Sequence, residues 1–505
     1  MTSRGRILVL WNQTEEDIYE RWRDDGPQAL AWDPTRTVPD VGTVAEEMDV
    51  FMTALHDGGY DARLINVDDE LERVFGAIRL YRPDAIFNLV EYFHDEPNQE
   101  AYIAGVYELM GYQYTGNRPV TLANCQNKYR TKILLEGADL PTSPFFLAKP
   151  GQPISEDHEL DYPVIVKPAF EDASGGIEPS SVVHDLPALI TQAQKIWKEF
   201  EMPALVEEYV EGREIHAAVL GDQKLEVLPL FEMEFDDSEF NPDEEWRPQI
   251  ISFRAKWDPH SKDFYSMDSV CPAQDLDPET EQYIREVALG AFKALGCRDY
   301  ARIDMRVDDD GEVYILEVNP NPDLVEGTAY VQCTAASGRT YSEAICTIAE
   351  LAIERGRKAK AKAKQAEALL RAGLPTDTLL REWHLQKTGV LPTERTGEDA
   401  APWDATAVSV AAAAAAAAQS GVGVTAADPV AIGAGLASAD VRGPDSLGGS
   451  LAGSGLSAAD DGGPAGAQTS PGADSAGSDA VSEEPASAES EPDTATDASR
   501  TDGEP

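Results

Sequence analysis

Three side chains with oxygen donors gather at the end of one predicted hairpin. Residues 300–307 and 312–319 alternate apolar and polar positions, and the turn between them contains Asp-Gly, which favours two antiparallel strands. If Val307 pairs with Glu312, side-chain alternation places four polar residues on one face of the hairpin. These residues are Arg302, Asp304, Glu317 and Asn319.

This register sets Arg302 opposite Glu317, at a Cβ separation of about 5 Å. A surface hairpin with a cross-strand ion pair would account for those two charges. A metal site would also account for the other oxygen donors and for the Asn-Pro-Asn-Pro segment at 319–322, where prolines stiffen the chain. Carboxylates and an amide without His or Cys favour Mg²⁺ or Mn²⁺, usually held together with substrate phosphates. The hairpin therefore predicts a magnesium–nucleotide site.

The elements that position this site begin with a region of alternating strands and helices. Residues 6–11 and 85–90 are predicted strands, and residues 44–57 have apolar positions near helical spacing before a Gly-Gly stop. Such alternation up to about residue 116 predicts a parallel α/β sheet. No phosphate-binding glycine motif follows the first strand, which speaks against a nucleotide site in this region.

A second region supplies further polar groups at the ends of apolar segments. The stretch "YPVIVKP" is a predicted strand that ends at Lys167, and a loop of small residues follows it. Residues 281–297 form a predicted amphipathic helix before the hairpin. The basic segment 355–371 is helix-forming throughout, either as a solvated helix or as a contact for an anion or a membrane.

Composition limits the class of partner and the compartment. The chain has 91 acidic and 41 basic residues and a formal net charge of -50, a field that repels nucleic acids and anionic membranes. No apolar run approaches the length of a membrane span. Its 5 cysteines are odd in number and form no Cys-x-x-Cys motif, so we expect reduced thiols in the cytoplasm. Residues 397–505 are acidic and nearly free of aromatics, which predicts a disordered tail.

Several of these segments carry a family resemblance over about residues 6–354. They are "ELMGYQYTGN", "NKYRTKILLEGADLP", "YPVIVKP", "VEEYVEGREI" and "RIDMRVDDDGEVYILEVNPNP". The sequence resembles the ATP-grasp superfamily, and within it the D-alanine–D-alanine ligases. The resemblance implies an α/β ATP-grasp fold preceded by a Rossmann-like parallel α/β domain. It also implies ATP as the nucleotide, Mg²⁺ or Mn²⁺ as two ions, and a homodimer.

The resemblance also implies a role for individual residues. Asp304, Glu317 and Asn319 match the metal ligands, and Arg302 matches the arginine that neutralises charge on an acyl phosphate. Nucleotide contacts are implied for Lys128, Lys167, Lys256, for the loop Ser174, Gly175 and Gly176, for Glu207 with Glu208, Tyr209 and Val210 at the adenine, and for Glu214 at the ribose. Arg302, Lys256 and Ser174 make up the implied catalytic set. The plainer interpretations are surface lysines, solvated strand carboxylates and an ordinary turn.

The substrate side departs from the family pattern. The family's histidine and its glycine-rich loop after the third strand are replaced by "FNLVEYFHDEPNQEAY", which leaves His94 out of register. Ala173 and Trp257 stand where the family has a serine and a tyrosine, and the family's glycine after its proline is Asp323. Substrate contacts are therefore predicted at Glu91, His94, Glu96, Ala173, Trp257, Asp323 and Thr328. For the acidic loop and for Asp323, a solvated loop and a turn cap are the alternatives.

These inferences predict a carboxylate–amine ligase that uses ATP and small-molecule substrates. The predicted divisions are an N-terminal α/β domain (1–120), two ATP-grasp subdomains (121–212 and 213–355), a helical extension (356–396) and the tail (397–505). One alternative is a nucleotide-binding regulatory protein built on a retired ligase. The other is a ligase that tailors a peptide or natural product.

Overall fold

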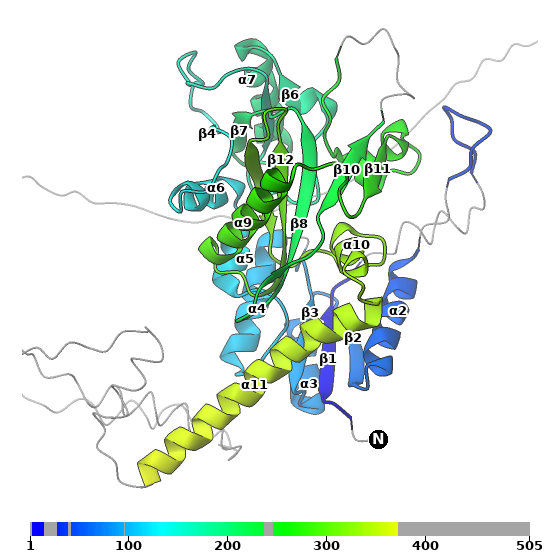
Figure 1. The fold of residues 1–505 in the computed structure, drawn as a ribbon, viewed down its shortest axis with the longest axis vertical. Coiled ribbons are helices and arrows are strands. Elements are labelled where there is room, and N and C mark those ends of the chain that lie inside the picture. Colours follow the sequence, from blue (N-terminus) through cyan, green and yellow to red (C-terminus); the bar gives the residue numbers. More distant parts are fainter. Residues whose placement is uncertain (1–2, 15–27, 39–41, 95, 237–245, 372–505) are drawn as a thin grey trace, which may run out of the picture. The chain divides into compact units, whose positions relative to one another are not determined.

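The computed structural model describes residues 3–14, 28–38, 42–94, 96–236 and 246–371 (Figure 1). The predicted tail and residues 372–396 of the predicted extension lie outside the described residues. Within the described ranges, no helix is long and apolar enough to cross a membrane.

The N-terminal region contains a three-stranded parallel sheet. Its order is β2 (Asp61–Asn66), β1 (Arg6–Trp11) and β3 (Ala85–Leu89). The central strand is buried on both faces: Ile7 and Val9 enter one hydrophobic cluster, and Leu8 and Leu10 enter another. The helices of this region are α2 (Val44–Asp57), α3 (Leu71–Tyr81), the short η1 (Pro97–Gln99) and α4 (Glu100–Leu109).

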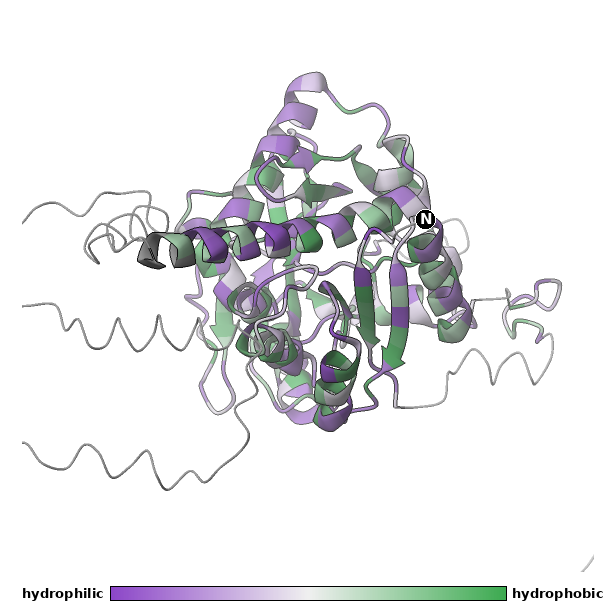
Figure 2. Cartoon of the chain, turned by 90° about the horizontal axis from the view of Figure 1, so that it is seen from below, coloured by the Kyte–Doolittle hydropathy of each residue, from purple (hydrophilic) through white to green (hydrophobic). Residues whose placement is uncertain are grey.

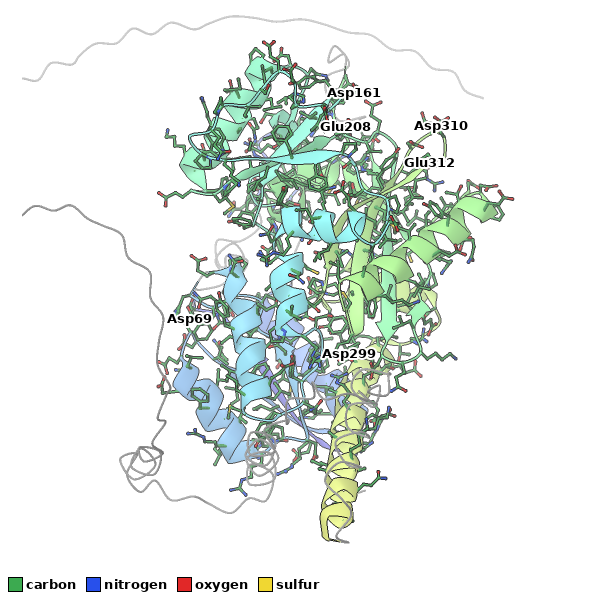
Figure 3. The ribbon with its side chains drawn as sticks, turned by 90° about the vertical axis from the view of Figure 1, so that its left-hand side faces the viewer. Asp69, Asp161, Glu208, Asp299, Asp310 and Glu312 are labelled. Carbon is green, nitrogen blue, oxygen red and sulfur yellow. The ribbon has the colours of Figure 1, made fainter. Side chains whose placement is uncertain are left out.

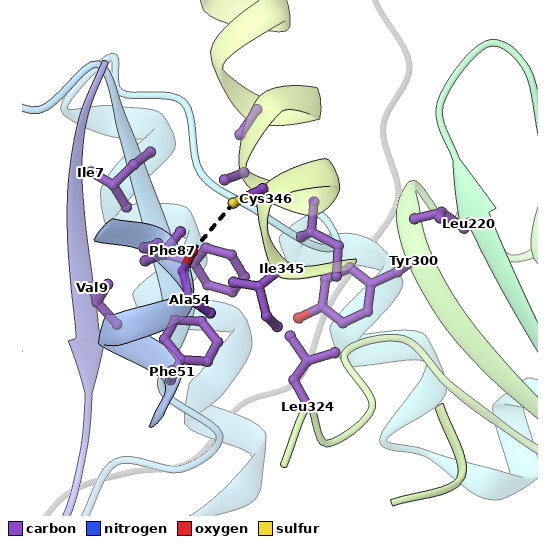
Figure 4. Close-up of a cluster of buried hydrophobic side chains, with 14 of the residues drawn as sticks. Ile7, Val9, Phe51, Ala54, Phe87, Leu220, Tyr300, Leu324, Ile345 and Cys346 are labelled. Atoms are coloured by element: carbon purple, nitrogen blue, oxygen red, sulfur yellow. Dashed lines mark hydrogen bonds between the residues drawn. The ribbon is translucent and has the colours of Figure 1, made fainter. Parts of the chain in front are cut away.

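The long helix α11 (Tyr341–Arg371) completes the core of this region. Figure 4 shows Ile345 and Cys346 of α11 facing Phe51 and Ala54 of α2, and the Cys346 thiol lies 3.6 Å from the carbonyl oxygen of Ala54. Hydrophilic and hydrophobic residues are mixed along α11 in Figure 2.

The basic part of α11 forms ion pairs with carboxylates of the same chain. The pairs are Arg355–Asp299, Arg357–Glu350, Lys358–Glu354 and Lys360–Asp84. These contacts favour the solvated basic helix over a dedicated anion site.

A four-stranded antiparallel sheet follows two short helices, α5 (Pro119–Cys125) and α6 (Lys128–Glu136). Its order is β4 (Phe145–Ala148), β7 (Ala204–Glu208), β5 (Val164–Pro168) and β6 (Val182–Val183). Helix α7 (Leu186–Glu199) packs its apolar side on this sheet through Leu189, Ala193 and Ile196. The turn η2 (Pro179–Ser181) precedes β6.

A six-stranded antiparallel sheet is the largest sheet in the part of the chain that the structure describes. Its order is β11 (Met267–Val270), β10 (Phe231–Phe235), β8 (Arg213–Gly221), β12 (Asp299–Val307) and β13 (Val313–Asn319), with β9 (Glu226–Val227) paired to β8. The associated helices are α8 (Phe253–Trp257), η3 (Lys262–Tyr265), α9 (Pro278–Ala294) and α10 (Ala329–Ala336).

The two faces of β8 and β12 differ in polarity. One face packs Ile215, Ala217, Ile303 and Met305 into a hydrophobic cluster with α9. Because side chains alternate along a strand, the intervening residues lie on the other face. Toward the hairpin turn, that face carries Glu214, His216, Arg302, Asp304 and Arg306.

The hairpin of β12 and β13 has a different register from the one predicted. Arg302 pairs with Asn319, Asp304 pairs with Glu317, and Met305 pairs with Ile315. The predicted pairing of Arg302 with Glu317 is therefore wrong. Two shifts cause the difference: the turn pairs Val307 with Val313 instead of Glu312, and a β-bulge at Leu316 adds one more residue. Bulges of this kind re-aim side chains.

Candidate functional site

The polar face of the hairpin brings together the predicted metal ligands. Asp304 and Glu317 lie directly opposite each other across the strands. The amide nitrogen of Asn319 lies between them, 2.8 Å from Asp304 Oδ2 and 3.3 Å from Glu317 Oε1. Two carboxylates and an amide thus share one short stretch of the sheet.

Two cations neutralise these carboxylates. Arg302 donates to both oxygens of Asp304, with Nε–Oδ1 and Nη2–Oδ2 distances of 2.7 Å each. Lys128, at the start of α6, donates to Glu317 Oε2 at 3.1 Å. Burial alone would raise the pKa of Glu317, but Lys128, Lys167 and Arg302 hold it well below its usual range. The cross-strand Arg302–Glu317 ion pair does not form.

The donor chemistry of this face fits a hard divalent cation. Asp304 and Glu317 supply carboxylate oxygens, and Asn319 can turn its amide oxygen toward an ion. Among the described residues, no group of three or more His, Cys, Asp or Glu side chains is arranged to hold a metal ion. The set is two carboxylates and an amide, and Arg302 competes with an ion for the oxygens of Asp304.

The second predicted phosphate lysine, Lys167, belongs to a buried triad with Glu207 and Lys132. Glu207 Oε2 lies 2.6 Å from Lys132 Nζ, and Glu207 Oε1 pairs with Lys167 Nζ. Lys132, Glu207 and Lys167 side chains are 1%, 1% and 7% exposed. Burial would raise the pKa of Glu207, but the two lysines lower it. Burial lowers the pKa of Lys132, and Glu207 opposes that effect.

The loop after β5 has left-handed backbone at three of its four central positions. Ala173, Ser174 and Gly176 have φ values of 48°, 63° and 70°. A Cβ atom on Gly176 would lie 2.7 Å from the ring of Phe200 and 2.8 Å from Pro168 Cγ, so only glycine fits there. Gly175 donates its N–H to Asp172 O at 2.7 Å.

Helix α8 holds this loop from the other side. The indole Nε1 of Trp257 donates to the carbonyl oxygen of Ala173 at 3.0 Å. The ammonium of Lys256 lies 4.9 Å from the centre of the Trp257 ring. The Lys256 side chain is exposed, yet surrounding protein and Arg302 lower its pKa. Two residues that replace family residues thus contact each other.

The segment after β7 holds the predicted adenine contacts. Glu208 and Tyr209 donate their backbone N–H groups to Pro144 O and Pro163 O, at 3.0 and 2.9 Å. The Glu208 side chain accepts from the backbone of Asp161 at 2.9 Å, and Figure 3 shows these two residues side by side. In the described part of the chain, the Val210 N–H makes no backbone hydrogen bond, which leaves it available to a ligand.

Glu214 is buried between a histidine and an arginine. Its carboxylate lies 3.1 Å from His216 Nε2 and 2.9 Å from Arg306 Nη2. Burial would raise the pKa of Glu214, but Arg306 and His216 lower it. The other ring nitrogen of His216 is buried, has no hydrogen-bond partner among the described residues, and lies 3.8 Å from Asp304 Oδ1. His216 therefore stands between the predicted ribose and metal carboxylates.

Comparison with known proteins places this arrangement in a family. A D-alanine–D-alanine ligase of Alcanivorax borkumensis is 34% identical over 265 residues, which are 52% of this chain and 76% of that protein. The chain belongs to the D-alanine–D-alanine ligase family. The family model described as the D-ala D-ala ligase C-terminus matches residues 134–350.

Other similar proteins extend the match over more of the chain. The uncharacterized protein y4sG of Sinorhizobium fredii is 32% identical over 356 residues, which are 69% of this chain and 97% of that protein. The crystal structure of D-alanine–D-alanine ligase from Bacillus anthracis complexed with ATP covers 71% of this chain and 100% of its own, at 19% identity and a TM-score of 0.52. This likeness confirms the predicted fold: ATP-grasp sheets preceded by a parallel α/β domain.

The substrate residues predicted from departures from the ligase family include a set of neighbouring carboxylates. The protein around Glu91 partly desolvates its carboxylate, and this effect, followed by the charges of Asp323 and Asp172, raises the pKa of Glu91 to about 7. Burial, Glu91 and Asp172 also raise the pKa of Glu100 to about 8, against a 2.6 Å hydrogen bond from Asn321. Desolvation is the largest cause of both shifts, and the charges of neighbouring carboxylates add to it.

The remaining predicted substrate residues make local contacts. Asp323 Oδ1 accepts from the Val325 N–H at 2.9 Å, and Thr328 Oγ1 donates to Asp323 O at 3.1 Å, so both residues stabilise one turn. His94 lies 3.5 Å from the carboxylate of Asp69, and Glu96 is exposed. The hydrogen bond from the Val325 N–H thus supports the interpretation of Asp323 as a turn cap.

Sequence reasoning missed four residues that support this ligase-family site. Lys132 follows Lys128 by four positions on α6, a spacing that puts both side chains on one helix face and was a usable signal. His216 follows Glu214 by two positions on β8, which also indicates a shared face. Asn117 and Asn321 gave no such signal, because their contact joins residues 204 positions apart.

Proposed function

We propose that this chain is an ATP-dependent carboxylate–amine ligase. A substrate carboxylate would attack the γ-phosphate of ATP to give an acyl phosphate and ADP. An amine would then attack the acyl carbon, giving an amide and phosphate. The observation that carries this proposal is the Lys128–Glu317 ion pair, because it joins a predicted phosphate lysine to a predicted metal ligand. Membership of the family supports the same reaction class.

The residues on the hairpin fit a role as magnesium ligands. Asp304, Glu317 and Asn319 would hold Mg²⁺ or Mn²⁺, as one or two ions. Such an ion supplies charge stabilisation to phosphate oxygens when it is bound.

The basic residues around the hairpin would handle the charge that develops during the reaction. Lys128 and Lys167 would bind the ATP phosphates, with Lys256 as a further phosphate contact. The loop Ser174–Gly176 would cover the phosphates and limit access of water. Arg302, once released from Asp304, would neutralise the acyl phosphate and the tetrahedral intermediate, since preorganised charge is usually the largest catalytic contribution.

The substrate side supports a specificity other than two D-alanines. Trp257 and Ala173 replace two hydroxyl groups with an indole–carbonyl contact. Glu91 and Asp323 would attract an additional ammonium group. Loss of a buried hydrogen bond to substrate costs about 1–3 kcal/mol, so D-alanine would be a poor substrate. The proposed substrates are small molecules, and we propose neither nucleic acid nor a membrane as a partner. The proposed assembly is a homodimer.

The test combines nucleotide binding with turnover. Isothermal titration should detect ATP binding that requires magnesium, and Glu317→Gln and Lys167→Ala should abolish or strongly weaken it. Glu312→Gln is the matched control, because Glu312 lies in the same hairpin near Asp310 at the exposed turn (Figure 3). Unchanged affinity and turnover in both site variants would contradict the proposal.

Products distinguish the ligase from its alternatives. Phosphate release should be measured over a panel of amino acids and small carboxylates, with products identified by mass spectrometry. A new amide identifies a ligase and its substrates. Magnesium-dependent ATP binding without turnover on any substrate would instead indicate a regulatory protein. The altered substrate residues are the reason for keeping that alternative. Efficient and selective D-alanyl-D-alanine synthesis would refute the proposed change in specificity.

A further inference from the structure

Lys132 occupies a position that no ligand can reach directly. Its ammonium donates to Glu207 Oε2 at 2.6 Å, to Thr142 Oγ1 at 2.5 Å and to Ser143 Oγ at 3.2 Å. A lysine ammonium has three N–H donors, so these partners use all of them. The side chain is 1% exposed. All hydrogen-bond donors of the Lys132 ammonium are therefore used by protein groups.

Lys167 has the opposite character within the same triad. Among the described residues, the only acceptor that its ammonium contacts is Glu207, which leaves donors for a ligand. Its side chain is also the most exposed of the three, at 7%. Any anion that reaches the triad would therefore meet Lys167 first.

The triad carries an unbalanced positive charge. Lys132 and Lys167 contribute two cations, and Glu207 contributes one anion. Buried charge is costly unless it is paired, so the surplus favours an anion at the open side of the triad. Without Lys132, Glu207 and Lys167 would form a neutral pair, and Lys167 would attract an anion much less.

We propose that Lys132 is a positioning residue for nucleotide binding: it neutralises Glu207, so that the charge of Lys167 is available to the phosphates of ATP. This inference rests on the proposed function, because it presumes that ATP binds at Lys167. It assigns to Lys132 an effect on phosphate affinity without any contact with the nucleotide.

The test separates phosphate recognition from adenosine recognition in the full-length protein. Titration calorimetry should give Kd values for Mg·ATP and for adenosine in wild type, in Lys132→Met and in the double variant Lys132→Met/Glu207→Gln. Lys293→Met, on the exposed side of α9, is the matched control for loss of a lysine. Thermal melting of each variant monitors folding.

The expected result is a selective loss of phosphate affinity. In Lys132→Met the Kd for Mg·ATP should rise about tenfold or more, as expected for one charge lost near the phosphates, while the adenosine Kd changes by less than about twofold. The double variant should restore most of the ratio between the two Kd values, since it returns a net positive charge to the triad. The double variant also removes the buried carboxylate that Lys132→Met would leave with one partner fewer. It can therefore still be measured if the single variant does not fold.

Three results would overturn the inference. An unchanged Mg·ATP affinity in Lys132→Met would show that its charge does not matter. Equal losses for Mg·ATP and adenosine, or a double variant whose ratio of the two Kd values stays at that of the single variant, would show that Lys132 only shapes the structure. Wild-type protein that binds no Mg·ATP would refute the proposed function itself, whereas wild-type binding with an unchanged Lys132→Met variant refutes the inference alone.

Discussion

Substitution of Gly116 by alanine should destabilise the protein by more than backbone strain alone. Gly116 has a φ of 80°, and a Cβ atom there would lie 2.2 Å from Oδ1 of Asn321. Asn321 stands between the two prolines that follow the predicted metal ligand Asn319. The new methyl group therefore has to displace a side chain that helps to fix the metal-binding end of β13.

The cost can be worked out from the contacts that Asn321 would lose. Its Oδ1 accepts from the Asn117 N–H at 3.0 Å, and its Nδ2 donates to Glu100 at 2.6 Å. Each hydrogen bond contributes about 1 kcal/mol net, and left-handed backbone costs a non-glycine residue about 1–2 kcal/mol. We expect Gly116→Ala to lower the free energy of unfolding by about 3–4 kcal/mol.

Gly111→Ala is a matched control for this prediction. Gly111 has nearly the same backbone, with a φ of 76°, but a methyl group there would meet no neighbouring atom within 4 Å. It should therefore cost only the backbone strain of about 1–2 kcal/mol. Urea unfolding of both variants measures the difference, and steady-state ATP turnover should fall more in Gly116→Ala. Equal losses of stability in the two variants would refute the role given to Asn321.

Three further predictions address the loop, the carboxylates and the tail. Trp257→Phe removes the hydrogen bond to Ala173 O, so the KM for ATP should rise about three- to tenfold while the melting temperature stays nearly constant; an unchanged KM would contradict this. The pKa of Glu100 is raised from 4.5 to about 8, so the folded state retains a proton that the unfolded chain releases, and stability falls as the pH rises through that window. Glu100→Gln should flatten this fall in pH-dependent thermal melts, and an identical profile would count against the shift. A chain that ends at Thr396 should keep the melting temperature and turnover of the full chain, as the composition of the tail predicts; failure of the shortened chain to fold would exclude this.

The sequence predicted the polar face of the hairpin but not its register. Asp304, Glu317 and Asn319 lie on one face because the two-residue alternation of each strand is a local property. The register depends on two shifts of one residue each. The turn pairs Val307 with Val313 instead of Glu312, which also makes Ile315 rather than Tyr314 the partner of Met305. The bulge at Leu316 adds the second shift, which no alternation signal reveals.

Contacts between segments that are distant in the sequence were the second feature of the site that the sequence did not predict. The strand 6–11 was predicted with its observed bounds, because an apolar run between Gly5 and the polar residues Asn12 and Gln13 is a local signal. Glu207 was predicted to contact adenine, yet its partners come from α6 and β5, which pack together only in the folded chain. The same limit applies to Trp257 and Ala173, which are 84 positions apart.

The bidentate contact between Arg302 and Asp304 places the guanidinium in competition with a metal ion. Both oxygens of Asp304 accept from Arg302, and Oδ2 also accepts from Asn319, so an ion held by both oxygens would weaken or replace the contact with Arg302. A guanidinium released in this way would stay near Glu317 and, under the proposed function, could neutralise an anion formed beside it. Metal binding and the release of Arg302 would then be coupled, so that one side-chain movement would make the guanidinium available after the metal is bound.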